Sequence, residues 1–475
     1  MKNVVVMGAG PIGLMAAVML ARDGHRVTVL ERDEAPPPTG DREEVWQRWH
    51  RPGVNQFRHP HLLLPAVLRT LTAEMPDAVT ELAALGGVHT NLLDGARRLG
   101  EIGRWRPGDD RFAMMTARRP LLEAALDSAA RRTERLQVRR GTAVTALLPG
   151  TERVARRPHV TGVLTASGEA VHGDLVIDAG GRNSPAGRML RNLGAPGPFE
   201  ERAEDGFLAY TRYFRTTDGS LPELPPAPSA HYPSVSSIAS LGDAGTWSLS
   251  VGISSRDRAL RKLSRPDAWH RTVKLLPDVA HWAEHGEPIT EILAMSGMET
   301  RHRRFVTEST PVATGILSIG DAWGTTNPLF GLGLSMGAVH AALLRDLLRT
   351  AATDDPEELA LSFAETTEST LGPVQRALAD WDRHRLAEIE AATGTPPSTY
   401  DTDDRTWHFK RALDTAKFKD PHLLRLYAAG ASLLAEPGTQ LPDAELARRI
   451  AHHRTGPPYG EPGPTRDELL AAVSA

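Results

Sequence analysis

The sequence predicts an α/β protein that begins with a parallel-sheet unit, contains an inserted β-rich domain and ends in a helical region. Three observations predict this order. Residues 4–31 read as strand, glycine turn, helix and strand, residues 206–253 as short alternating strands, and residues after 351 as mostly helical. We therefore expect the first unit at 1–185 and 301–350, the β-rich domain at 186–300 and the helical region at 351–475.

Composition limits the possible functions. The chain has 475 residues, enough for two or three structural units with a large core. A net charge of -4 provides no strong field for nucleic acid. Because the sequence contains no cysteine, disulfides, thiolate nucleophiles and thiolate metal ligands are excluded, and redox chemistry requires a bound cofactor. We expect a cytoplasmic protein that binds neither a metal nor nucleic acid.

The apolar start of the chain resembles a targeting segment only superficially. Glycines interrupt it and acidic residues follow without a small-residue cleavage site, so we interpret it as a strand. No stretch approaches the roughly 18 apolar residues that a membrane-spanning helix needs. We therefore expect no transmembrane segment.

The elements of the first unit follow in order. Strands at 4–7 and 26–31 enclose a helix at 14–21, and the prolines at 36–38 end this part. We expect a long polar loop over 41–60. Further expected elements are helices at 62–85, 120–130 and 334–348, strands at 136–138, 143–148, 159–165, 175–179 and 316–319, and a hairpin turn at 167–168.

The helical region has its own periodicity. Val374, Leu378 and Trp381 have i, i+4 and i+7 spacing, which is typical of one apolar helix face. Proline-rich connectors near Pro396 and Pro457 divide the region into separate helices. We expect it to act as a cap on the other domains, and a surface for oligomer formation is the alternative.

The turn after the first strand has the spacing G-x-G-x-x-G. Gly8 permits a tight turn, Gly10 lets the backbone approach a pyrophosphate, and Gly13 permits close packing of helix on strand. The helix N-terminus offers unpaired N–H groups to the phosphates. Glu31, at the end of the second strand, can accept hydrogen bonds from an adenosine ribose. This unit predicts a Rossmann-like site for an adenine dinucleotide without separating FAD from NAD.

Two later segments carry a more specific resemblance. Residues 173–184 form a strand that leads past Asp178 into a glycine turn, and residues 318–333 contain the pattern G-D-A…N-P…G-x-G. Together with the first glycine turn, these motifs resemble FAD-dependent monooxygenases of the para-hydroxybenzoate hydroxylase fold. The resemblance covers most of the chain and is thinnest in the β-rich domain.

The resemblance implies an FAD-binding domain and a β-rich domain that binds the substrate. It implies that Asp321 contacts the ribityl chain, that Arg119 reaches the cofactor, and that the last glycine turn places a helix N-terminus near the flavin N1 and C2 carbonyl. A helix dipole there would stabilise the anionic reduced flavin. The expected FAD contacts are Gly8, Gly10, Gly13, Glu31, Arg119, Val144, Asp178, Asp321, Pro328, Gly331 and Gly333.

Residues 53–61 are similar to a segment of bacterial squalene-epoxidase-like monooxygenases and polyether epoxidases, which carry a similar glutamine, arginine and spaced histidines after the second strand. The resemblance makes Arg58 and His59 candidate catalytic residues that orient flavin or substrate. A structural role for His59 and His61 stays open, because imidazole is useful in both settings.

The resemblance further implies a flavin C4a-hydroperoxide that epoxidises or hydroxylates a lipophilic or aromatic small molecule in secondary metabolism, with dioxygen as co-substrate. NADPH or NADH would supply electrons, directly or through a flavin reductase. The site must exclude water to protect such chemistry. The expected substrate contacts are Tyr210, Arg212, Tyr213, Leu329 and Phe330.

Two other functions stay open at this point. The same scaffold supports a flavin-dependent reductase or dehydrogenase that transfers no oxygen. A nucleotide fold also occurs in non-catalytic nucleotide-binding proteins and in hydrolases, because fold alone does not fix function.

Three motifs indicate other chemistry only weakly. G-x-S-x-G at 333–337 lies too far from the preceding strand to form a nucleophile elbow. H-x-x-E-H at 281–285 lacks a third zinc ligand. Residues 46–49 resemble part of a flavin halogenase motif, but the lysine that such enzymes need is missing, since the sequence has none between Lys2 and Lys262. We therefore expect no serine hydrolase, zinc site or halogenase.

Overall fold

The computed structural model describes residues 1–350, 355–434, 444–453 and 463–475. Its centre is a five-stranded sheet with the order β21-β10-β1-β2-β6, and its strand pairs are all parallel. The strands are β1 (Asn3–Met7), β2 (Arg26–Leu30), β6 (Leu136–Arg139), β10 (Leu175–Asp178) and β21 (Ile316–Ser318). The predicted α/β fold is confirmed, with a Rossmann-like core assembled from two distant parts of the chain.

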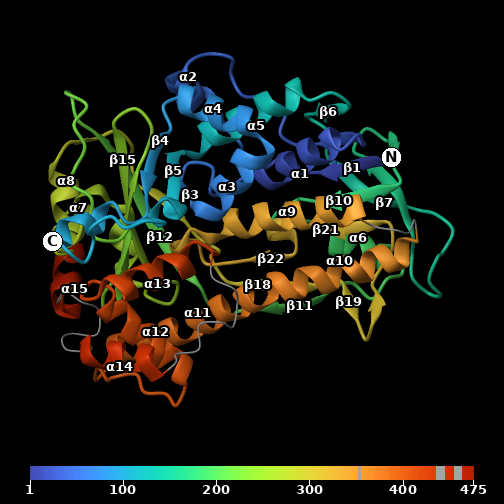
Figure 1. The fold of residues 1–475 in the computed structure, drawn as a ribbon. Coiled ribbons are helices and arrows are strands. Elements are labelled where there is room, and N and C mark those ends of the chain that lie inside the picture. The colour runs from blue at the N-terminus through green and yellow to red at the C-terminus, as the bar shows by residue number, and fades with distance from the viewer. Residues whose placement is uncertain (351–354, 435–443, 454–462) are drawn as a thin grey trace.

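Helices cover one face of this sheet, and a small β meander covers the other (Figure 1). The helical side consists of α1 (Pro11–Arg22), α3 (Pro65–Glu74), α4 (Pro76–Ala84), α5 (Arg119–Arg132) and α9 (Leu332–Thr350). The other side consists of β7 (Val144–Pro149), β8 (Val160–Thr165), β9 (Ala170–His172) and α6 (Ala186–Asn192). Because both faces are buried, the central strands are nearly continuous in apolar residues, as at Val4, Val5 and Val6.

The loop expected at 41–60 and the helix expected at 62–85 both differ from the prediction. α2 (Arg42–Arg48) forms inside the loop because the Asp41 side chain caps it, accepting hydrogen bonds from two N–H groups of its first turn. The first residues of the expected helix instead belong to a strand, β3 (Pro60–Leu63). This strand forms a three-stranded sheet of order β3-β5-β4 with β4 (Val88–Asn91) and β5 (Ala113–Arg118). Pro65 and Pro76 then begin two separate helices.

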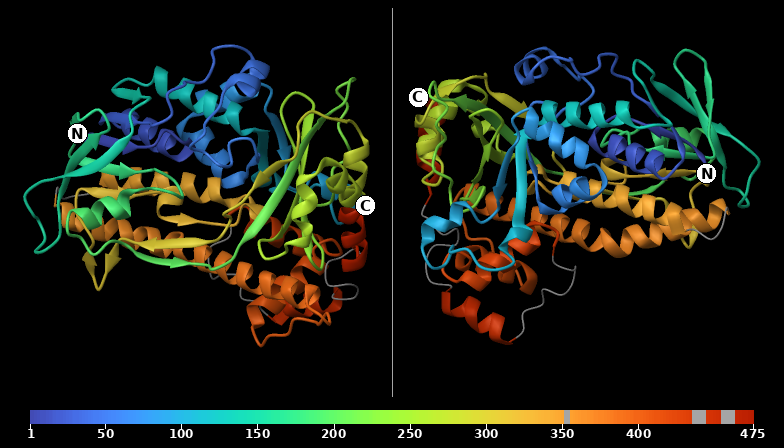
Figure 2. Two further views of the ribbon diagram at one scale, coloured as in Figure 1. Left: turned by 180° about the vertical axis from the view of Figure 1, so that it is seen from behind. Right: turned by 45° about the horizontal axis from the view of Figure 1, so that its top comes forward.

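A second large sheet stands at one end of the molecule (Figure 2). Its strands have the order β13-β14-β15-β12-β16, β17 also pairs with β12, and the pairs are antiparallel. They are β12 (Phe207–Arg215), β13 (Ser229–His231), β14 (Val235–Leu241), β15 (Thr246–Ser254), β16 (Glu287–Pro288) and β17 (Leu293–Met295). The outer face is covered by η3 (Ala259–Ser264), α7 (Pro266–Lys274) and α8 (Ala280–Glu284). We call this the second sheet.

Short elements connect the two sheets. β11 (Phe199–Arg202) pairs with β18 (Arg301–Arg304), which pairs with β22 (Gly324–Thr325). Because β11 precedes the second sheet and β18 follows it, this pairing joins the two ends of the insertion. The remaining short elements are η1 (Gly95–Leu99), η2 (Asp109–Phe112), β19 (Val306–Thr307), β20 (Thr310–Pro311), η4 (Gly320–Ala322) and η5 (Pro328–Phe330).

The C-terminal region is helical, as predicted. Its described helices are α10 (Pro356–Thr370), α11 (Gly372–Thr393), α12 (Arg405–Ala416), α13 (Pro421–Ala431), α14 (Ala444–His453) and α15 (Arg466–Ser474). Leu378 and Trp381 are buried on α11, with Val374 half-buried. α11 ends before Pro396, whereas the connector expected near Pro457 lies outside the described residues.

These helices do not all pack on one another. α10 packs against α9, and α12 and α14 share an apolar cluster of their own. α15 instead packs on α7 and η3, where Leu469 and Val473 join the core of the second sheet. In Figure 1 the C-terminus accordingly lies beside α7. The last helix therefore completes the core of the inserted domain.

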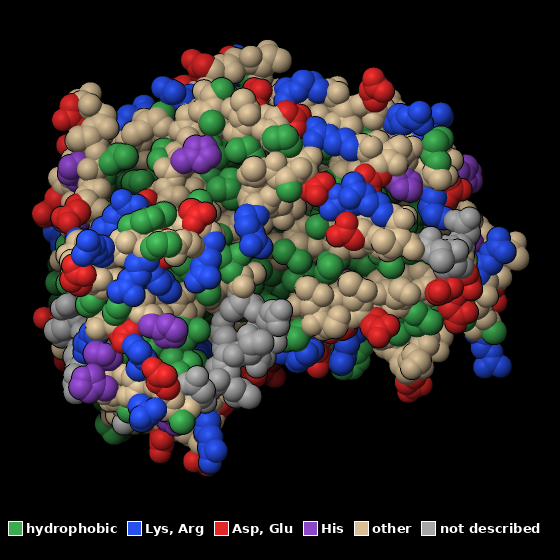
Figure 3. All heavy atoms as spheres, viewed as in Figure 1, with side chains coloured by type: hydrophobic (Ala, Val, Ile, Leu, Met, Phe, Trp, Pro, Cys, Tyr) green, Lys and Arg blue, Asp and Glu red, His purple; other side chains and the backbone are tan. Residues whose placement is uncertain are grey.

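On the face drawn in Figure 3, basic and acidic side chains are intermingled, in keeping with the small net charge. Among the helices that the structure describes, none combines the length and the apolar character that crossing a membrane demands.

Candidate functional site

The first glycine turn has the geometry of a phosphate-binding turn. Gly8 has φ of 107°, and a Cβ there would lie 2.7 Å from the carbonyl oxygen of Ala179. A Cβ on Gly13 would lie 2.1 Å from the carbonyl oxygen of Gly8, so close packing requires this glycine. At Gly10, by contrast, no described atom lies within 4 Å of the Cβ position. No side chain caps α1 at this residue, so its first N–H groups stay available to an anion.

Glu31 follows β2 and reaches back to this turn. Its Oε2 accepts hydrogen bonds from the N–H of Ala9 at 2.8 Å and from Arg51 at 2.5 Å, and its Oε1 accepts one from the N–H of Asp33 at 3.0 Å. A carboxylate has about four acceptor positions, so Oε1 can still accept a hydrogen bond from a ribose hydroxyl.

Arg51 is the centre of a buried ion-pair cluster that sequence analysis did not identify. Its guanidinium contacts the carboxylates of Glu31, Asp33 and Glu123, and its Nη1 donates to the carbonyl oxygen of Ala9 at 3.1 Å. Burial alone would lower the pKa of Arg51, but Glu123 and Glu31 raise it above its ordinary value. The charged side chain thus fixes the glycine turn to β2 and α5.

Asp178 ends β10 and supports the turn that follows. Its buried carboxylate accepts hydrogen bonds from Ser184 Oγ at 2.7 Å, the N–H of Gly180 at 3.0 Å and Ser318 Oγ at 3.2 Å. Burial raises its pKa, and these hydrogen bonds oppose the shift. The structure gives Asp178 this supporting role, and its direct contact with FAD stays a prediction.

Asp321 lies just beyond β21, at the carboxyl end of the parallel sheet. Within the described ranges, its carboxylate has no hydrogen-bond or ion-pair partner. Burial raises its pKa, while the nearby guanidinium groups of Arg119, Arg182 and Arg303 oppose the shift. An unpartnered carboxylate at this edge of the sheet is placed to accept hydrogen bonds from a ligand.

The loop from Asn327 to Gly333 turns the chain into α9. Asn327 Oδ1 accepts a hydrogen bond from the N–H of Leu329 at 2.9 Å, Pro328 begins η5, and Gly331, with φ of 67°, ends it. Cβ positions at Gly331 and Gly333 would lie no closer than 3.6 Å to any described atom outside their own backbone. The loop therefore presents bare backbone where the resemblance implies a flavin ring.

Asp382 on α11 holds this loop from the helical region. Its Oδ1 accepts a hydrogen bond from Asn327 Nδ2 at 3.1 Å, and its Oδ2 accepts one from the Thr300 hydroxyl. Burial raises the pKa of Asp382 to about 7. Sequence analysis missed this residue because nothing near it in the chain indicates a partner 55 positions away.

His59 and His61 connect the first unit to its neighbours. His59 Nδ1 lies 3.2 Å from Thr211 Oγ1 of the second sheet, and His61 Nε2 accepts from Arg119 Nη1 at 3.0 Å. Burial lowers the pKa of His59 to about 4 and that of His61 to about 3. Arg119 Nε also donates to Glu123 at 2.6 Å. His59 thus joins the segment before β3 to the second sheet as a neutral ring, and His61 orients Arg119.

Arg58 contacts the α2 segment. Its guanidinium donates to the carbonyl oxygens of Trp46 and Trp49, the latter at 2.9 Å, and lies 4.5 Å from the Trp46 ring centre. The Trp46 ring in turn meets Tyr213 edge to face, with centroids 5.2 Å apart. Burial lowers the pKa of Arg58. Of the two catalytic candidates, only His59 hydrogen-bonds to the second sheet.

The second sheet places the predicted substrate residues on opposite faces. Side chains alternate along a strand, so Thr211 and Tyr213 point inward to the first unit, while Tyr210 and Arg212 point outward. Tyr210 packs in the apolar core with α7 and α8, and Arg212 Nε donates to the carbonyl oxygen of Thr290 at 3.0 Å. Tyr210 and Arg212 therefore do not share a face with Tyr213, and their contact with a substrate stays a prediction.

Leu329 and Phe330 lie between the glycine-rich loop and the inward face. Leu329 approaches the sheet at Gly252, where a Cβ would lie 2.8 Å from Leu329 Cδ2. Phe330 packs edge to face against Trp381, with centroids 4.5 Å apart. These contacts bring the loop, the second sheet and α11 together.

The other singled-out residues have structural surroundings. Val144 begins β7 and packs in the core between the meander and the parallel sheet, so its contact with FAD stays a prediction. Ser335 is buried inside α9, away from any turn between strand and helix. His281 Nε2 lies 2.9 Å from the carbonyl oxygen of Glu223, whereas the ring of His285 packs against Trp247.

The residues present fit FAD. Gly10 and the uncapped start of α1 leave room for a pyrophosphate, and Glu31 keeps an acceptor for the ribose. Asp321 offers an unpartnered carboxylate, and the backbone at Gly331 and Gly333 is bare. These features lie along one route from the first strand to the start of α9, which is what an extended dinucleotide requires.

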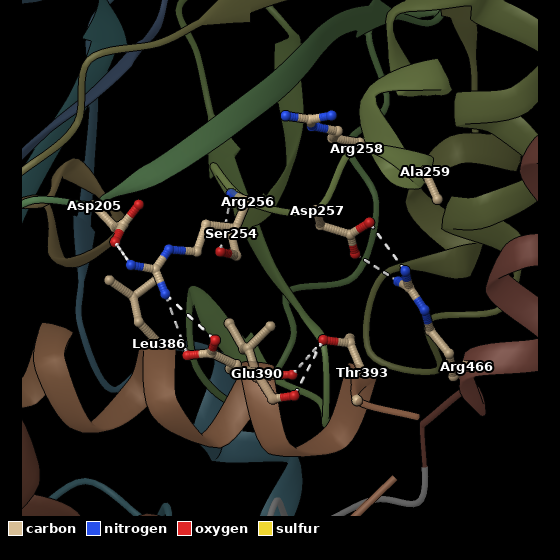
Figure 4. Close-up of a pocket in the computed structure, with 12 residues that line it drawn as sticks. Asp205, Ser254, Arg256, Asp257, Arg258, Ala259, Leu386, Glu390, Thr393 and Arg466 are labelled. Atoms are coloured by element: carbon tan, nitrogen blue, oxygen red, sulfur yellow. Dashed lines mark hydrogen bonds and ion pairs between the residues drawn. The ribbon is translucent and has the colours of Figure 1, made fainter. Parts of the chain in front are cut away.

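Two surface pockets lie outside this route. One, of about 350 Å³, lies between the second sheet and α11 (Figure 4). There Arg256 pairs with Asp205 and Glu390, and Arg466 pairs with Asp257 at 2.5 Å, so ion pairs hold α11 and α15 to the sheet. The other, of about 550 Å³, is lined by Asp41, Arg42, Glu43, Ala84, Leu85, Arg215 and Ala244.

Comparison with known proteins agrees with this geometry. Residues 1–47 match the family model described as FAD binding domain. This match covers the first glycine turn and Glu31. Over its length it is 26% identical to Protein Rv3254 of Mycobacterium tuberculosis, covering 95% of this chain and 94% of that protein.

Solved structures share the fold. PqsL of Pseudomonas aeruginosa, described as a probable FAD-dependent monooxygenase, has a TM-score of 0.59 at 16% identity, over 82% of this chain and 96% of its own. The flavin-dependent brominase Bmp2 has a TM-score of 0.60 at 16% identity, over 95% of this chain and 98% of its own. At such identities the likeness establishes the fold and leaves the reaction to be argued from the site.

Proposed function

We propose that the protein is an FAD-dependent monooxygenase that transfers one oxygen atom of dioxygen to a small molecule. The observation that carries this proposal is the position of the loop at 327–333. It lies next to the dinucleotide-binding unit and also touches the inward face of the second sheet, at the contact of Leu329 with Gly252. A cofactor ring against this loop would face the second sheet.

Bound FAD would supply the redox chemistry and the activation of dioxygen, with electrons from NADPH or NADH, directly or through a flavin reductase. The residues of the chain bind and orient it. The turn at Gly10 and the start of α1 would hold the pyrophosphate, Glu31 the ribose and Asp321 the ribityl chain. The start of α9 would stabilise negative charge on the reduced ring.

The overall reaction balances with familiar reactants. Substrate, dioxygen, NAD(P)H and one proton would give the oxygenated product, NAD(P)⁺ and water. The protein must also keep bulk water out of such a site. His59 and Thr211 are both buried where the segment before β3 meets the second sheet, and neither carries a charge near pH 7.

The inward face of the second sheet bears on the choice between hydroxylation and epoxidation. Resemblance to squalene-epoxidase-like enzymes favours a lipophilic alkene, but Thr211, Ser248 and Ser250 make this face polar. PqsL has also been solved in complex with 2-aminobenzoylacetate. We therefore place hydroxylation of a polar or aromatic molecule ahead of epoxidation. Location in the cytoplasm and a role in secondary metabolism stay predictions.

The experiment begins with purified protein, which should be yellow and release FAD on heating. With NADPH, a flavin reductase and a panel of substituted benzoates and phenols under ¹⁸O₂, we expect a product carrying one labelled oxygen. Catalase in the assay removes hydrogen peroxide and serves as the control for indirect oxidation. An unlabelled product would favour a reductase or dehydrogenase instead. Colourless protein that cannot be loaded with FAD would favour a non-catalytic nucleotide-binding protein or a hydrolase.

A further inference from the structure

Buried polar atoms without partners gather where the sheet of β3, β4 and β5 faces the second sheet. Thr116 Oγ1 and Arg118 Nη1 belong to β5, and Tyr213 Oη and Ser248 Oγ belong to β12 and β15. Each of these residues is at most 2% exposed, and by distance and angle none of the four atoms has a hydrogen-bond partner within the described part of the chain. Burial raises the pKa of Tyr213, and the Ser248 hydroxyl, which faces the phenol, opposes the shift. Burial makes such unmade hydrogen bonds costly, which points to a ligand that makes them.

The four atoms lie on facing surfaces. Alternation along β5 puts Thr116 and Arg118 on one side of that strand. Tyr213 and Ser248 are direct cross-strand partners, so their side chains are neighbours on the inward face. The Trp46 ring joins the two surfaces, since Arg118 Cζ lies 4.5 Å from its centre and Tyr213 packs against its edge.

Arg118 is held so that one edge of its guanidinium is unused. Its Nε and Nη2 donate to the carboxylate of Asp243, at 2.8 and 2.6 Å, and its backbone N–H donates to the same group. Nη1 is left over. A fixed guanidinium edge is a geometry that suits an oxygen with negative charge.

The charges nearby favour an anion. The side chains of Arg58, Arg118 and Arg215 are positive, and those of Asp243 and Glu43 are negative. Arg58 donates to backbone carbonyl groups, and burial followed by the charge of Arg118 lowers its pKa. An added carboxylate would balance this excess positive charge.

The inward face of the second sheet runs from a surface pocket to the glycine-rich loop. Inward-facing positions on β12 run from Ala209 through Thr211 and Tyr213 to Arg215. Arg215 lines the surface pocket of about 550 Å³. At the other end, Ala209 pairs with Gly252, against which Leu329 packs. Tyr213 thus stands between an opening and the expected position of the flavin.

We propose that Arg118, Tyr213 and Ser248 form a subsite for an anionic oxygen of the substrate, either a carboxylate or a phenolate. The substrate is then a small organic acid or phenol, and an uncharged alkene is excluded. The claim that the bound anion is the substrate rests on the proposed function, whereas the claim that the subsite binds an anion is independent of it.

Calorimetric titration of the FAD-loaded protein tests the subsite without turnover. Benzoate is the carboxylate probe, benzamide is its uncharged counterpart, and 4-nitrophenol, whose phenolate is coloured, is the phenolate probe. We expect benzoate or 4-nitrophenolate to bind at least about tenfold more tightly than benzamide. Tyr213→Phe should weaken the preferred anion about tenfold, and Ser248→Ala several-fold.

Ser237→Ala is the matched control. Like Ser248 beside Tyr213, Ser237 is a buried serine beside a tyrosine, Tyr232, but it lies on the outward face of β14. The Ser237→Ala substitution should leave the affinity for the anion unchanged. Circular dichroism and FAD content verify that each variant is folded.

Equal affinity for benzoate and benzamide, together with no binding of 4-nitrophenolate, would overturn the subsite. So would equal losses in the Ser248→Ala and Ser237→Ala variants. The labelled-oxygen experiment is independent: selective anion binding without oxygen incorporation contradicts only the proposed function, and oxygen incorporation without selective binding contradicts only the subsite.

Discussion

The two faces of the second sheet are both buried but are built from different side chains. On β15, Trp247, Leu249 and Val251 point outward into an apolar core with α7, α8 and α15. Ser248 and Ser250 alternate with them and point inward. Apolar burial stabilises a fold by about 25 cal/mol per Å², whereas a buried hydroxyl contributes only when it is hydrogen-bonded. The outward face therefore serves folding, and the inward face is better explained by what it binds.

The largest expected effect is on the outward face. Trp247→Ala should lower the free energy of unfolding by about 3–5 kcal/mol, because a fully buried indole leaves a cavity. Ser248→Ala, one residue along on the inward face, should change it by less than about 1 kcal/mol. Urea unfolding followed by circular dichroism measures both. Losses of similar size would remove the distinction between the faces.

Acidification should act through the inward contact of His59 with Thr211. Burial lowers the pKa of folded His59 to about 4 from an ordinary value of 6.5. Between these two pH values the His59 ring binds a proton in the unfolded chain but not in the folded one. Its contribution to the free energy of unfolding therefore falls as the pH drops from 6.5 to 4, by up to about 3 kcal/mol.

His59→Gln isolates this effect, because it removes the titrating ring. Its stability should fall less steeply than that of the unaltered protein between pH 6.5 and 4, as measured by urea unfolding at a series of pH values. Asp382, whose pKa burial raises to about 7, acts in the opposite direction in both proteins, since its folded form keeps a proton that the unfolded chain has lost. Parallel curves would contradict the assignment to His59.

The contrast between packing and binding recurs within the first glycine turn. Gly13→Ala should cost about 1–3 kcal/mol of stability, because its Cβ would meet the carbonyl oxygen of Gly8 at 2.1 Å. Gly10→Ala meets no described atom within 4 Å, so stability without cofactor should be nearly unchanged. FAD affinity, measured by flavin fluorescence, should nevertheless fall for Gly10→Ala. Unchanged affinity would place the pyrophosphate elsewhere.

The smallest effect compares two tyrosines on one strand. Tyr213→Phe removes a buried hydroxyl whose only described hydrogen-bonding neighbour is the Ser248 hydroxyl, so stability should stay constant or rise by up to about 1 kcal/mol. Tyr210→Phe, on the outward face, should leave benzoate affinity unchanged. Thermal unfolding and calorimetric titration of the two variants provide the measurements. A weaker affinity in Tyr210→Phe alone would reverse our assignment of the faces.

Local sequence patterns predicted the fold well, because the signals were local. The spacing of Gly8, Gly10 and Gly13 and the β-branched strands around them depend on neighbouring residues. α2 was missed although Asp41 is a typical cap, since the prediction gave more weight to the polar, aperiodic stretch around it. The sequence could also have shown that Tyr210 and Tyr213 lie on opposite faces of β12, because side chains alternate along a strand.

Long-range partners explain what sequence reasoning could not supply. Arg51 meets Glu123 across 72 positions, and Arg118 meets Asp243 across 125. An arginine side chain is usually exposed, so burial of these two guanidinium groups depends on tertiary structure. The same holds for Asp382, which reaches the loop of Asn327 from another part of the fold.

The packing of α15 on the second sheet has a consequence for synthesis of the chain. Leu469 and Val473 fill a core whose other members end at Ala283. At about 5–20 residues per second, a ribosome reaches Arg466 roughly ten to forty seconds after Ala283. During that interval the apolar surface of α7 and η3 that α15 later covers is exposed. We therefore expect the inserted domain to be the part of the nascent chain that most needs a chaperone.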